Sequence, residues 1–169
     1  MKMLVSAASR HGATAEIARA IGETLTEAGL EAVVLPPDAV TTLDGYDAAV
    51  LGSGIYLDHW MDEAKHLAER HADALASRPV WLFSSGPVGA SPRPDEDPVD
   101  ITGIIEETHA REHRLFAGKV DTAVLGQGEK VILTAFQVPE GDFRPWDDVR
   151  EWARGIAASL KAEPPAAGA

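Results

Sequence analysis

Three short stretches of this sequence combine glycines with hydroxyl side chains, and each follows an apolar run. They are SRHGAT (9–14), GSGIYLDHW (52–60) and SSGPVG (84–89). Glycine lets a backbone approach a ligand closely, while hydroxyls and the free amides of a helix start hydrogen-bond anions. Small residues also make ordinary turns and helix caps, which explains any one stretch taken alone. Their recurrence at three places favours a shared ligand site.

The first stretch predicts an anion cradle. Ser9 and Thr14 supply hydroxyls at the start of a helix-period segment, and Gly12 permits close approach of the backbone. The sequence contains neither GxxxxGK[ST] nor GxGxxG, so it indicates neither a nucleoside triphosphate nor a Rossmann dinucleotide. A single terminal phosphate fits this turn best.

The segments around these stretches must hold them in place. We expect strands at 2–8, 31–35, 47–52, 79–84 and 114–117. We expect helices at 14–28, 61–76, 99–110, 129–136 and 145–160. Alternating strands and helices indicate an α/β fold, a doubly wound five-stranded parallel sheet with helices on both faces. Ligands of such sheets bind beyond the carboxyl ends of the strands, where the three stretches lie.

The composition narrows the possible functions. The 169 residues predict a single domain at 1–161 and a disordered, Pro- and Ala-rich C-terminal tail at 162–169. The formal charge of −12 disfavours nucleic acid as a partner. The absence of cysteine removes disulfides, thiolate metal sites and thiol redox chemistry. Because no apolar run approaches the ~20 residues of a membrane span, we expect a cytoplasmic protein without a transmembrane segment.

Other polar groupings indicate no catalytic centre. His109 and His113 are one helical turn apart, but HExxH is absent, and a solvated helix face explains them better than a metal site. Asp95–Asp97 is a charged loop, with a partner-docking surface as the alternative. No Ser-His-Asp arrangement can be assembled from the sequence. We therefore assign neither a catalytic residue nor a metal ligand.

The first stretch also resembles a known phosphate loop. Its spacing S-x-x-G-x-T is similar to the T-x-T-G-x-T loop of flavodoxins. ASRHGATAEIA more closely resembles the flavodoxin-like family that includes menaquinone-dependent protoporphyrinogen oxidase. The likeness continues through GSGIYLDHW, FSSGPVG, HRLFAGKVD and PEGDFRPWDDVREWA, so it covers nearly the whole chain except the tail. It implies a flavodoxin-like sheet of strand order 2-1-3-4-5, with noncovalent FMN at the ends of the first, third and fourth strands.

The resemblance implies a role for each stretch. The residues around the FMN phosphate would be Ser9, Arg10, His11, Gly12, Ala13 and Thr14. The residues beside the isoalloxazine ring would be Ser53, Gly54, Ile55, Tyr56 and Trp60. The residues along the pyrimidine edge, where backbone amides adjust the flavin's electronics, would be Ser84, Ser85, Gly86, Pro87, Val88 and Gly89.

Several of these residues have a second interpretation. His11 stands where flavodoxins often have a hydroxyl, so a donor is either missing or replaced by a ring N–H. Arg10 either adds charge at the phosphate or extends into solvent. Trp60 is either a ring neighbour or a core residue that opens the second helix, whereas we expect Tyr56 to stack on the ring. The third stretch is otherwise a plain Gly-Pro turn.

Three functions are compatible with the resemblance. The leading hypothesis is an FMN-dependent oxidoreductase similar to quinone-dependent protoporphyrinogen oxidase, taking electrons from a porphyrinogen and passing them to a quinone. One alternative is a flavodoxin-type electron carrier, whose charge of −12 suits a basic redox partner protein. The other is a cofactor-free interaction module of the same fold. The acidic, Pro-rich stretch 89–98 and the lack of a basic amphipathic segment count against a reaction at the membrane.

Overall fold

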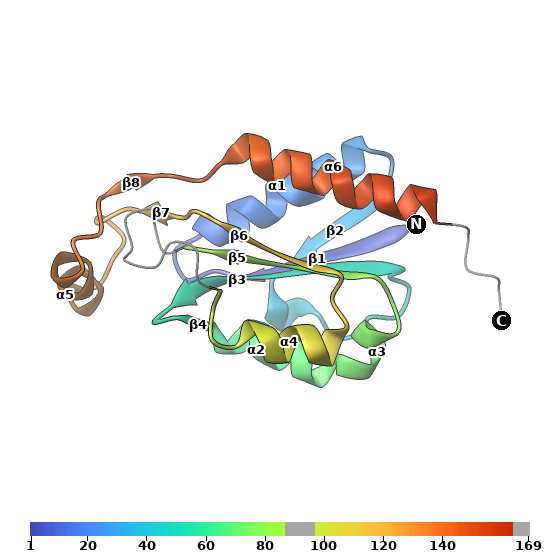
Figure 1. Ribbon diagram of the computed structural model, residues 1–169, viewed down its shortest axis with the longest axis horizontal. Helices are drawn as coiled ribbons and strands as arrows, with labels where there is room; N and C mark the ends of the chain where they lie inside the picture. Colours follow the sequence, from blue (N-terminus) through green and yellow to red (C-terminus); the bar gives the residue numbers. More distant parts are fainter. Residues whose placement is uncertain (87–96, 164–169) are drawn as a thin grey trace.

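The computed structural model describes residues 1–86 and 97–163. Its central sheet has five parallel strands: β1 (Lys2–Ala8), β2 (Glu31–Leu35), β3 (Ala48–Tyr56), β5 (Val80–Ser85) and β6 (Glu112–Phe116). They lie in the order β2-β1-β3-β5-β6, and each neighbouring pair is parallel (Figure 1). This is the predicted order 2-1-3-4-5, so the doubly wound α/β fold is confirmed.

Helices cover both faces of the sheet, as Figure 1 shows with the sheet seen nearly edge-on. On one face lie α1 (Ala13–Glu27) and α6 (Trp146–Ala162). On the other lie α2 (Asp62–Arg70), α3 (Ala72–Ala76) and α4 (Ile101–Thr108), while the short turn η1 (Pro37–Ala39) follows β2. Because successive strand residues point to opposite faces, Met3 and Val5 join the core under α1 and α6, whereas Leu4 joins the core under α2 and α4.

An aromatic cluster anchors α6 to the sheet. The rings of Phe83, Phe116 and Trp152 lie with centroids 5.6 to 6.3 Å apart in tilted and edge-on arrangements. Such geometries are favourable beyond the area that they bury. Gly52 on β3 leaves room for this cluster, because a Cβ there would lie 2.2 Å from the Phe83 ring.

The predicted third strand, 47–52, is too short. β3 runs on to Tyr56 and turns back into the two-residue strand β4 (His59–Trp60), which pairs antiparallel with it. The turn residues Leu57 and Asp58 have φ of 48° and 64°. Two left-handed residues suit the twist of a hairpin, but the usual signal for such a turn is Asn-Gly or Asp-Gly. The sequence Leu-Asp therefore gave no sign of it.

Two predicted helices also differ from the structure. The helix at 61–76 is divided into α2 and α3 at His71, although one apolar face runs through both. The helix at 99–110 ends at Thr108, and His109 has a φ of 52°. His113 lies on β6 with its side chain 6% exposed. The interpretation of His109 and His113 as neighbours on a solvated helix face is therefore wrong, because the helix ends before both of them and His113 belongs to a strand.

Residues 117–145 leave the sheet between β6 and α6, and we call this segment the excursion. It contains β7 (Lys119–Val120), α5 (Gln127–Ala135) and β8 (Gly141–Asp142), and β7 pairs antiparallel with β8. In Figure 1, α5 stands well away from the helices that cover the sheet. Its nine residues include no buried one.

Part of the predicted organisation falls outside the described residues. This applies to Pro87, Val88 and Gly89 of the third stretch, to Asp95 and Glu96 of the charged loop, and to 164–169 of the predicted tail. The division into a domain at 1–161 and a tail at 162–169 stays a prediction. Within 1–86 and 97–163, no helix is both long and apolar enough to cross a membrane.

Candidate ligand site at the carboxyl edge of the sheet

The first two stretches and the described start of the third, residues 84–86, lie side by side at the carboxyl edge of the sheet. Ala8 at the end of β1 pairs with Ser53, and Ser53 pairs with Ser84 on β5. The first two loops also touch, because a Cβ on Gly54 would lie 3.1 Å from Thr14 Oγ1. One ligand can therefore contact all three loops.

The first loop has the features of an anion site. Gly12 is the N-cap of α1, with φ of +89°, and no side chain caps the helix, so the first amides of α1 are available to a ligand. Nothing lies within 4 Å of the point where a Gly12 side chain would begin. Ser9 Oγ is buried and has no hydrogen-bond partner among the described residues. These groups fit a phosphate bound by backbone amides and a hydroxyl.

The two side chains before Gly12 contact other elements. His11 Nε2 lies 2.9 Å from Glu129 Oε1 on α5, and Arg10 Nε lies 3.4 Å from the same oxygen. The guanidinium carbon of Arg10 also lies 4.6 Å from the centre of the Tyr56 ring, a cation–π distance. The hydrogen bonds from His11 and from the Gly126 amide hold the pKa of Glu129 below its usual range. The half-exposed Arg10 thus links the first loop, the second loop and α5.

The second loop has a buried part and an exposed part. Ser53 Oγ donates to the Gly54 carbonyl at 2.8 Å and accepts from the Met61 amide at 2.9 Å. Trp60 is 2% exposed and donates from Nε1 to Ser84 Oγ at 2.7 Å, which favours its interpretation as a core residue. Tyr56, in contrast, is 38% exposed. Of these side chains, Tyr56 is the one with surface open to a planar ligand, and Arg10 covers part of its ring.

A buried serine, a histidine and an aspartate come together below the third loop. Ser84 Oγ lies 2.8 Å from His113 Nε2, and His113 Nδ1 lies 3.1 Å from Asp97 Oδ1. The order resembles a hydrolase triad, which the sequence did not predict. However, Ser84 is 0% exposed and its oxygen already accepts from Trp60, so it cannot attack a substrate.

The donors and acceptors among Trp60, Ser84, His113 and Asp97 follow from the Trp60 indole, which can only donate. Since the Trp60 indole donates to Ser84, the Ser84 hydroxyl is free to donate to a neutral His113, whose Nδ1–H donates to Asp97. Burial lowers the pKa of His113, and Asp97 opposes this only in part. The group ties the end of β5 to β4 and β6, and so holds the start of the third loop.

Asp100 holds the β3–β4 hairpin against α4. Its carboxylate lies 2.9 Å from His59 Nδ1 and accepts from the Trp60 amide at 3.0 Å. Burial raises the pKa of Asp100, but the hydrogen bonds from His59 and Trp60 outweigh it and lower the pKa below the usual value. The hairpin that carries Tyr56 is therefore fixed at its base.

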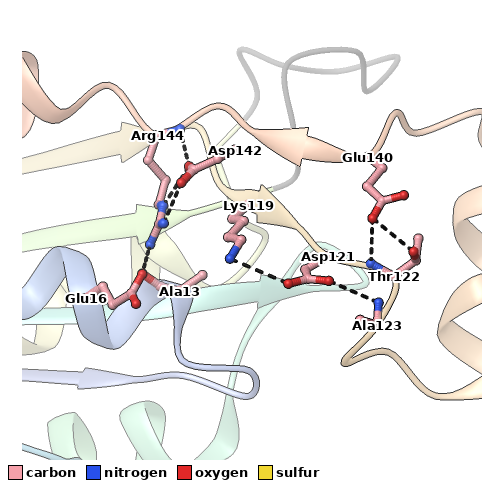
Figure 2. A network of polar contacts seen from close by, with 9 residues as sticks. All are labelled: Ala13, Glu16, Lys119, Asp121, Thr122, Ala123, Glu140, Asp142 and Arg144. Atoms are coloured by element: carbon pink, nitrogen blue, oxygen red, sulfur yellow. Dashed lines mark hydrogen bonds and ion pairs between the residues drawn. The ribbon is translucent and has the colours of Figure 1, made fainter.

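Arg144 connects the excursion to the first loop. Figure 2 shows it reaching from beside β8 to the first turn of α1. It forms two parallel bonds to Asp142, at 2.8 and 2.6 Å, a third to the Ala13 carbonyl at 3.2 Å and an ion pair with Glu16. Its guanidinium also stacks on Trp146, with 4.5 Å between the carbon and the ring centre. This clamp lowers the pKa of Asp142 to about 2.

The sequence missed these supporting residues for a common reason. They act through partners far along the chain, such as Ala13 with Arg144 or Ser84 with His113, and no local spacing encodes such pairs. Glu129 had a weak local signal, because Gly126-x-x-Glu129 resembles a capping box and Glu129 does accept from the Gly126 amide. That signal predicts a helix start, not a contact with His11.

Comparison with known proteins agrees with this architecture. A flavodoxin variant from Pseudomonas aeruginosa superposes with a TM-score of 0.66 at 20% identity, covering 96% of this chain and 100% of that one. Rubredoxin oxygen:oxidoreductase from Desulfovibrio gigas superposes with a TM-score of 0.65 at 13% identity, covering 95% of this chain and 36% of that one. At sequence identities of 20% and 13%, the structural similarity shows a shared fold and nothing more.

Sequence comparison finds similarity to an enzyme. Protoporphyrinogen IX dehydrogenase (quinone) of Escherichia coli K12 is 30% identical over 94 residues, which cover 54% of this chain and 52% of the enzyme. The match thus spans about half the length of the relative. The family model for a flavodoxin domain matches residues 4–143. The chain therefore belongs to the flavodoxin domain family, a family of FMN-binding flavoproteins that transfer electrons.

Proposed function

We propose that this protein is an FMN-dependent oxidoreductase that resembles quinone-dependent protoporphyrinogen oxidase. The observation that carries FMN binding is the first loop, where an uncapped helix start, the open space at Gly12 and the unpartnered Ser9 hydroxyl meet. Bound FMN would supply electron transfer between a reductant and a quinone. The enzyme assignment is supported by the 30% identity to the dehydrogenase over about half of each chain.

In this proposal each loop has a distinct task. The 9–14 stretch binds the phosphate through the amides of α1, Ser9 and Thr14. Residues 54–56 lie beside the ring, where Tyr56 excludes water from one side. The 84–89 stretch lies along the pyrimidine edge, and Gly86, with φ of +99° and its amide bonded to the Phe116 carbonyl at 3.0 Å, sets the course of its backbone.

Three buried side chains of the predicted site hold the loops in place in this proposal. Ser53, Trp60 and Ser84 have their polar atoms bonded within the protein, so they orient the loops and do not bind FMN directly. No side chain is assigned a catalytic role. Proton and electron transfer would occur on the cofactor, and the loops would set its position and its exposure to water.

A flavodoxin-type electron carrier is the second candidate function. Its support is the formal charge of −12 together with flavodoxin-like folds that match over 96% of this chain. A strongly acidic carrier is steered to a basic redox partner by long-range attraction. A cofactor-free interaction module is the third candidate, and it predicts that no flavin binds.

The test begins with the cofactor. The purified apoprotein is titrated with FMN, FAD and riboflavin, and flavin fluorescence reports binding. We expect FMN to bind most tightly, because the first loop is built for one terminal phosphate. Tighter binding of FAD contradicts the phosphate assignment, and binding of none of the three favours the interaction module.

The reduced holoprotein then separates enzyme from carrier. It is mixed anaerobically with menaquinone, with oxygen or with a basic ferric heme protein, and reoxidation is followed by flavin absorbance. The enzyme proposal predicts fastest reoxidation by menaquinone, and turnover with protoporphyrinogen in preference to unrelated reductants. Fast reoxidation by the heme protein with no quinone turnover supports the carrier.

A further inference from the structure

Among the residues that the structure describes, helix α5 makes its polar contacts with the rest of the domain through one acidic side chain, Glu129. None of its nine residues is buried, so apolar packing does not fix it. Within residues 1–86 and 97–163, its polar contacts outside the excursion are those of Glu129 with Arg10 and His11. The Glu129 side chain is only 14% exposed although the helix around it is open. The position of α5 therefore depends on this carboxylate.

The carboxylate engages the two side chains that could assist an anion. Arg10 and His11 directly precede Gly12, the N-cap of the uncapped helix α1. A phosphate at the start of α1 would be drawn to the same two side chains and would be repelled by Glu129, which carries charge of the same sign. Arg10 is also stacked on Tyr56, so the contact reaches the second loop.

We propose that Glu129 is a specificity-determining residue of the ligand site, whose carboxylate holds Arg10 and His11 until a phosphate-bearing ligand displaces it. The inference rests on the proposed function, because it takes the first loop as the phosphate site. Glu129 lowers the preference for a phosphorylated ligand over the same ligand without phosphate. Binding of the phosphate also releases α5 from the loop and frees Arg10 from its contact with Glu129.

The first experiment compares two isosteric variants. Glu129→Gln removes the charge and keeps a carbonyl oxygen that can accept from His11. Glu140→Gln is the matched control, since it removes a charge from the same excursion and can still accept from Thr122, whose hydroxyl lies 3.0 Å from Glu140 Oε1. Both variants and the wild type are titrated with FMN and with riboflavin, which differ only in the phosphate.

We expect Glu129→Gln to raise the affinity for FMN about twofold to fivefold, the range of one partly exposed charge pair. The affinity for riboflavin should not change. In Glu140→Gln the FMN affinity should change by less than about twofold, because a more distant charge is screened. An FMN-to-riboflavin affinity ratio in Glu129→Gln that equals or falls below the wild-type ratio overturns the proposal.

The second experiment follows α5 itself by amide hydrogen exchange over residues 127–138. Inorganic phosphate or FMN should speed exchange in the wild type, whereas in Glu129→Gln, which lacks the charge that holds Arg10, exchange should change little when either is added. Slower exchange on adding phosphate overturns the proposal. The exchange measurement with inorganic phosphate needs no flavin, so it tests the role of Glu129 separately from the proposed function. A protein that binds neither FMN nor riboflavin refutes the proposed function, while the response to phosphate still decides the role of Glu129.

Discussion

At the scale of single residues, Gly12 has two properties that any side chain would remove. Its φ of +89° belongs to the left-handed region, and the space in front of its Cα is open. Left-handed backbone costs an L-residue roughly 1–2 kcal/mol. The open space is where the proposed phosphate meets the amides of α1. Stability and ligand binding therefore respond to this position for separate reasons.

Gly12→Asp should lower FMN affinity by about tenfold or more, because it places a carboxylate beside the helix start that binds the phosphate. Gly155→Asp is the control, since it adds the same charge at an exposed position of α6. Gly12→Ala separates strain from charge. Flavin fluorescence titration measures affinity, and urea unfolding measures stability. Equal FMN affinity in the two Asp variants would remove Gly12 from the site.

His113 makes the stability of the domain sensitive to mild acid. Burial holds its pKa in the folded state below the 6.5 of the unfolded chain. The unfolded state therefore takes up a proton first as the pH falls, so stability is full above about 6.5 and declines as the pH falls toward the folded pKa. Protonation would also leave the buried Ser84 hydroxyl without its acceptor.

His113→Gln should remove this part of the pH dependence. The variant is expected to be less stable than the wild type at pH 8, with a difference that shrinks as the pH falls to 5. Urea unfolding at several pH values measures it, and His66→Gln, at an exposed position of α2, is the control. A gap that stays constant from pH 8 to 5 would mean that His113 does not titrate in this way.

At the scale of elements, the excursion is joined to the sheet by Arg144. Its side chain is 5% exposed and bonds β8 and the first turn of α1 at the same time. A planar guanidinium can make the two parallel bonds to Asp142 and stack on Trp146, whereas an ammonium can do neither. The start of α1, and with it the first loop, depends on this contact.

Arg144→Lys should therefore destabilise the domain by about 1–3 kcal/mol, since buried acceptors lose their donors. Amide exchange in residues 13–17 should become faster as well. Arg154→Lys on the exposed face of α6 is the control and should change neither. Loss of stability without faster exchange in α1 would show that Arg144 supports α6 and β8 only.

The elements that sequence patterns predicted best are short apolar runs with a clear end. The strands at 2–8 and 31–35 match the structure residue for residue: the first is a buried run that ends at a turn, and the second, which is only partly buried, ends at Pro36 and Pro37. The hairpin at 57–58 was missed because its turn has no typical residues. The loops of the site could be predicted from their glycines and hydroxyls. The residues that hold these loops in place could not be predicted, since contacts such as that of Glu129 with His11 join residues 118 positions apart.

At the scale of the whole molecule, the fold is compatible with more than one function. The neighbours in structure include a flavodoxin matched over its full length and an oxidoreductase in which the matched part is 36% of the chain. The same sheet thus occurs as a separate protein and as part of a larger one. Function must therefore be inferred from the edge where the loops meet and from the charge around it.

That charge gives the test that separates carrier from enzyme. Asp58 lies in the turn of the hairpin that carries Tyr56, and Asp62 follows the hairpin at the start of α2. In a chain of net charge −12, a basic partner is therefore attracted to this edge and a neutral quinone is not. A carrier should lose about tenfold in its electron-transfer rate to a basic heme protein as salt is raised from about 0.02 to 0.3 M, because exposed charges are screened over a Debye length.

The pair Asp58→Asn and Asp62→Asn should lower that rate at low salt more than the control pair Glu23→Gln and Glu27→Gln, which lies toward the far end of α1. For the enzyme that we propose, reoxidation by menaquinone should be fast in all of these variants and independent of salt. Stopped-flow absorbance of the reduced flavin measures both rates, and a quinone rate that is slow throughout, beside a fast salt-dependent rate to the heme protein, would assign the protein as a carrier.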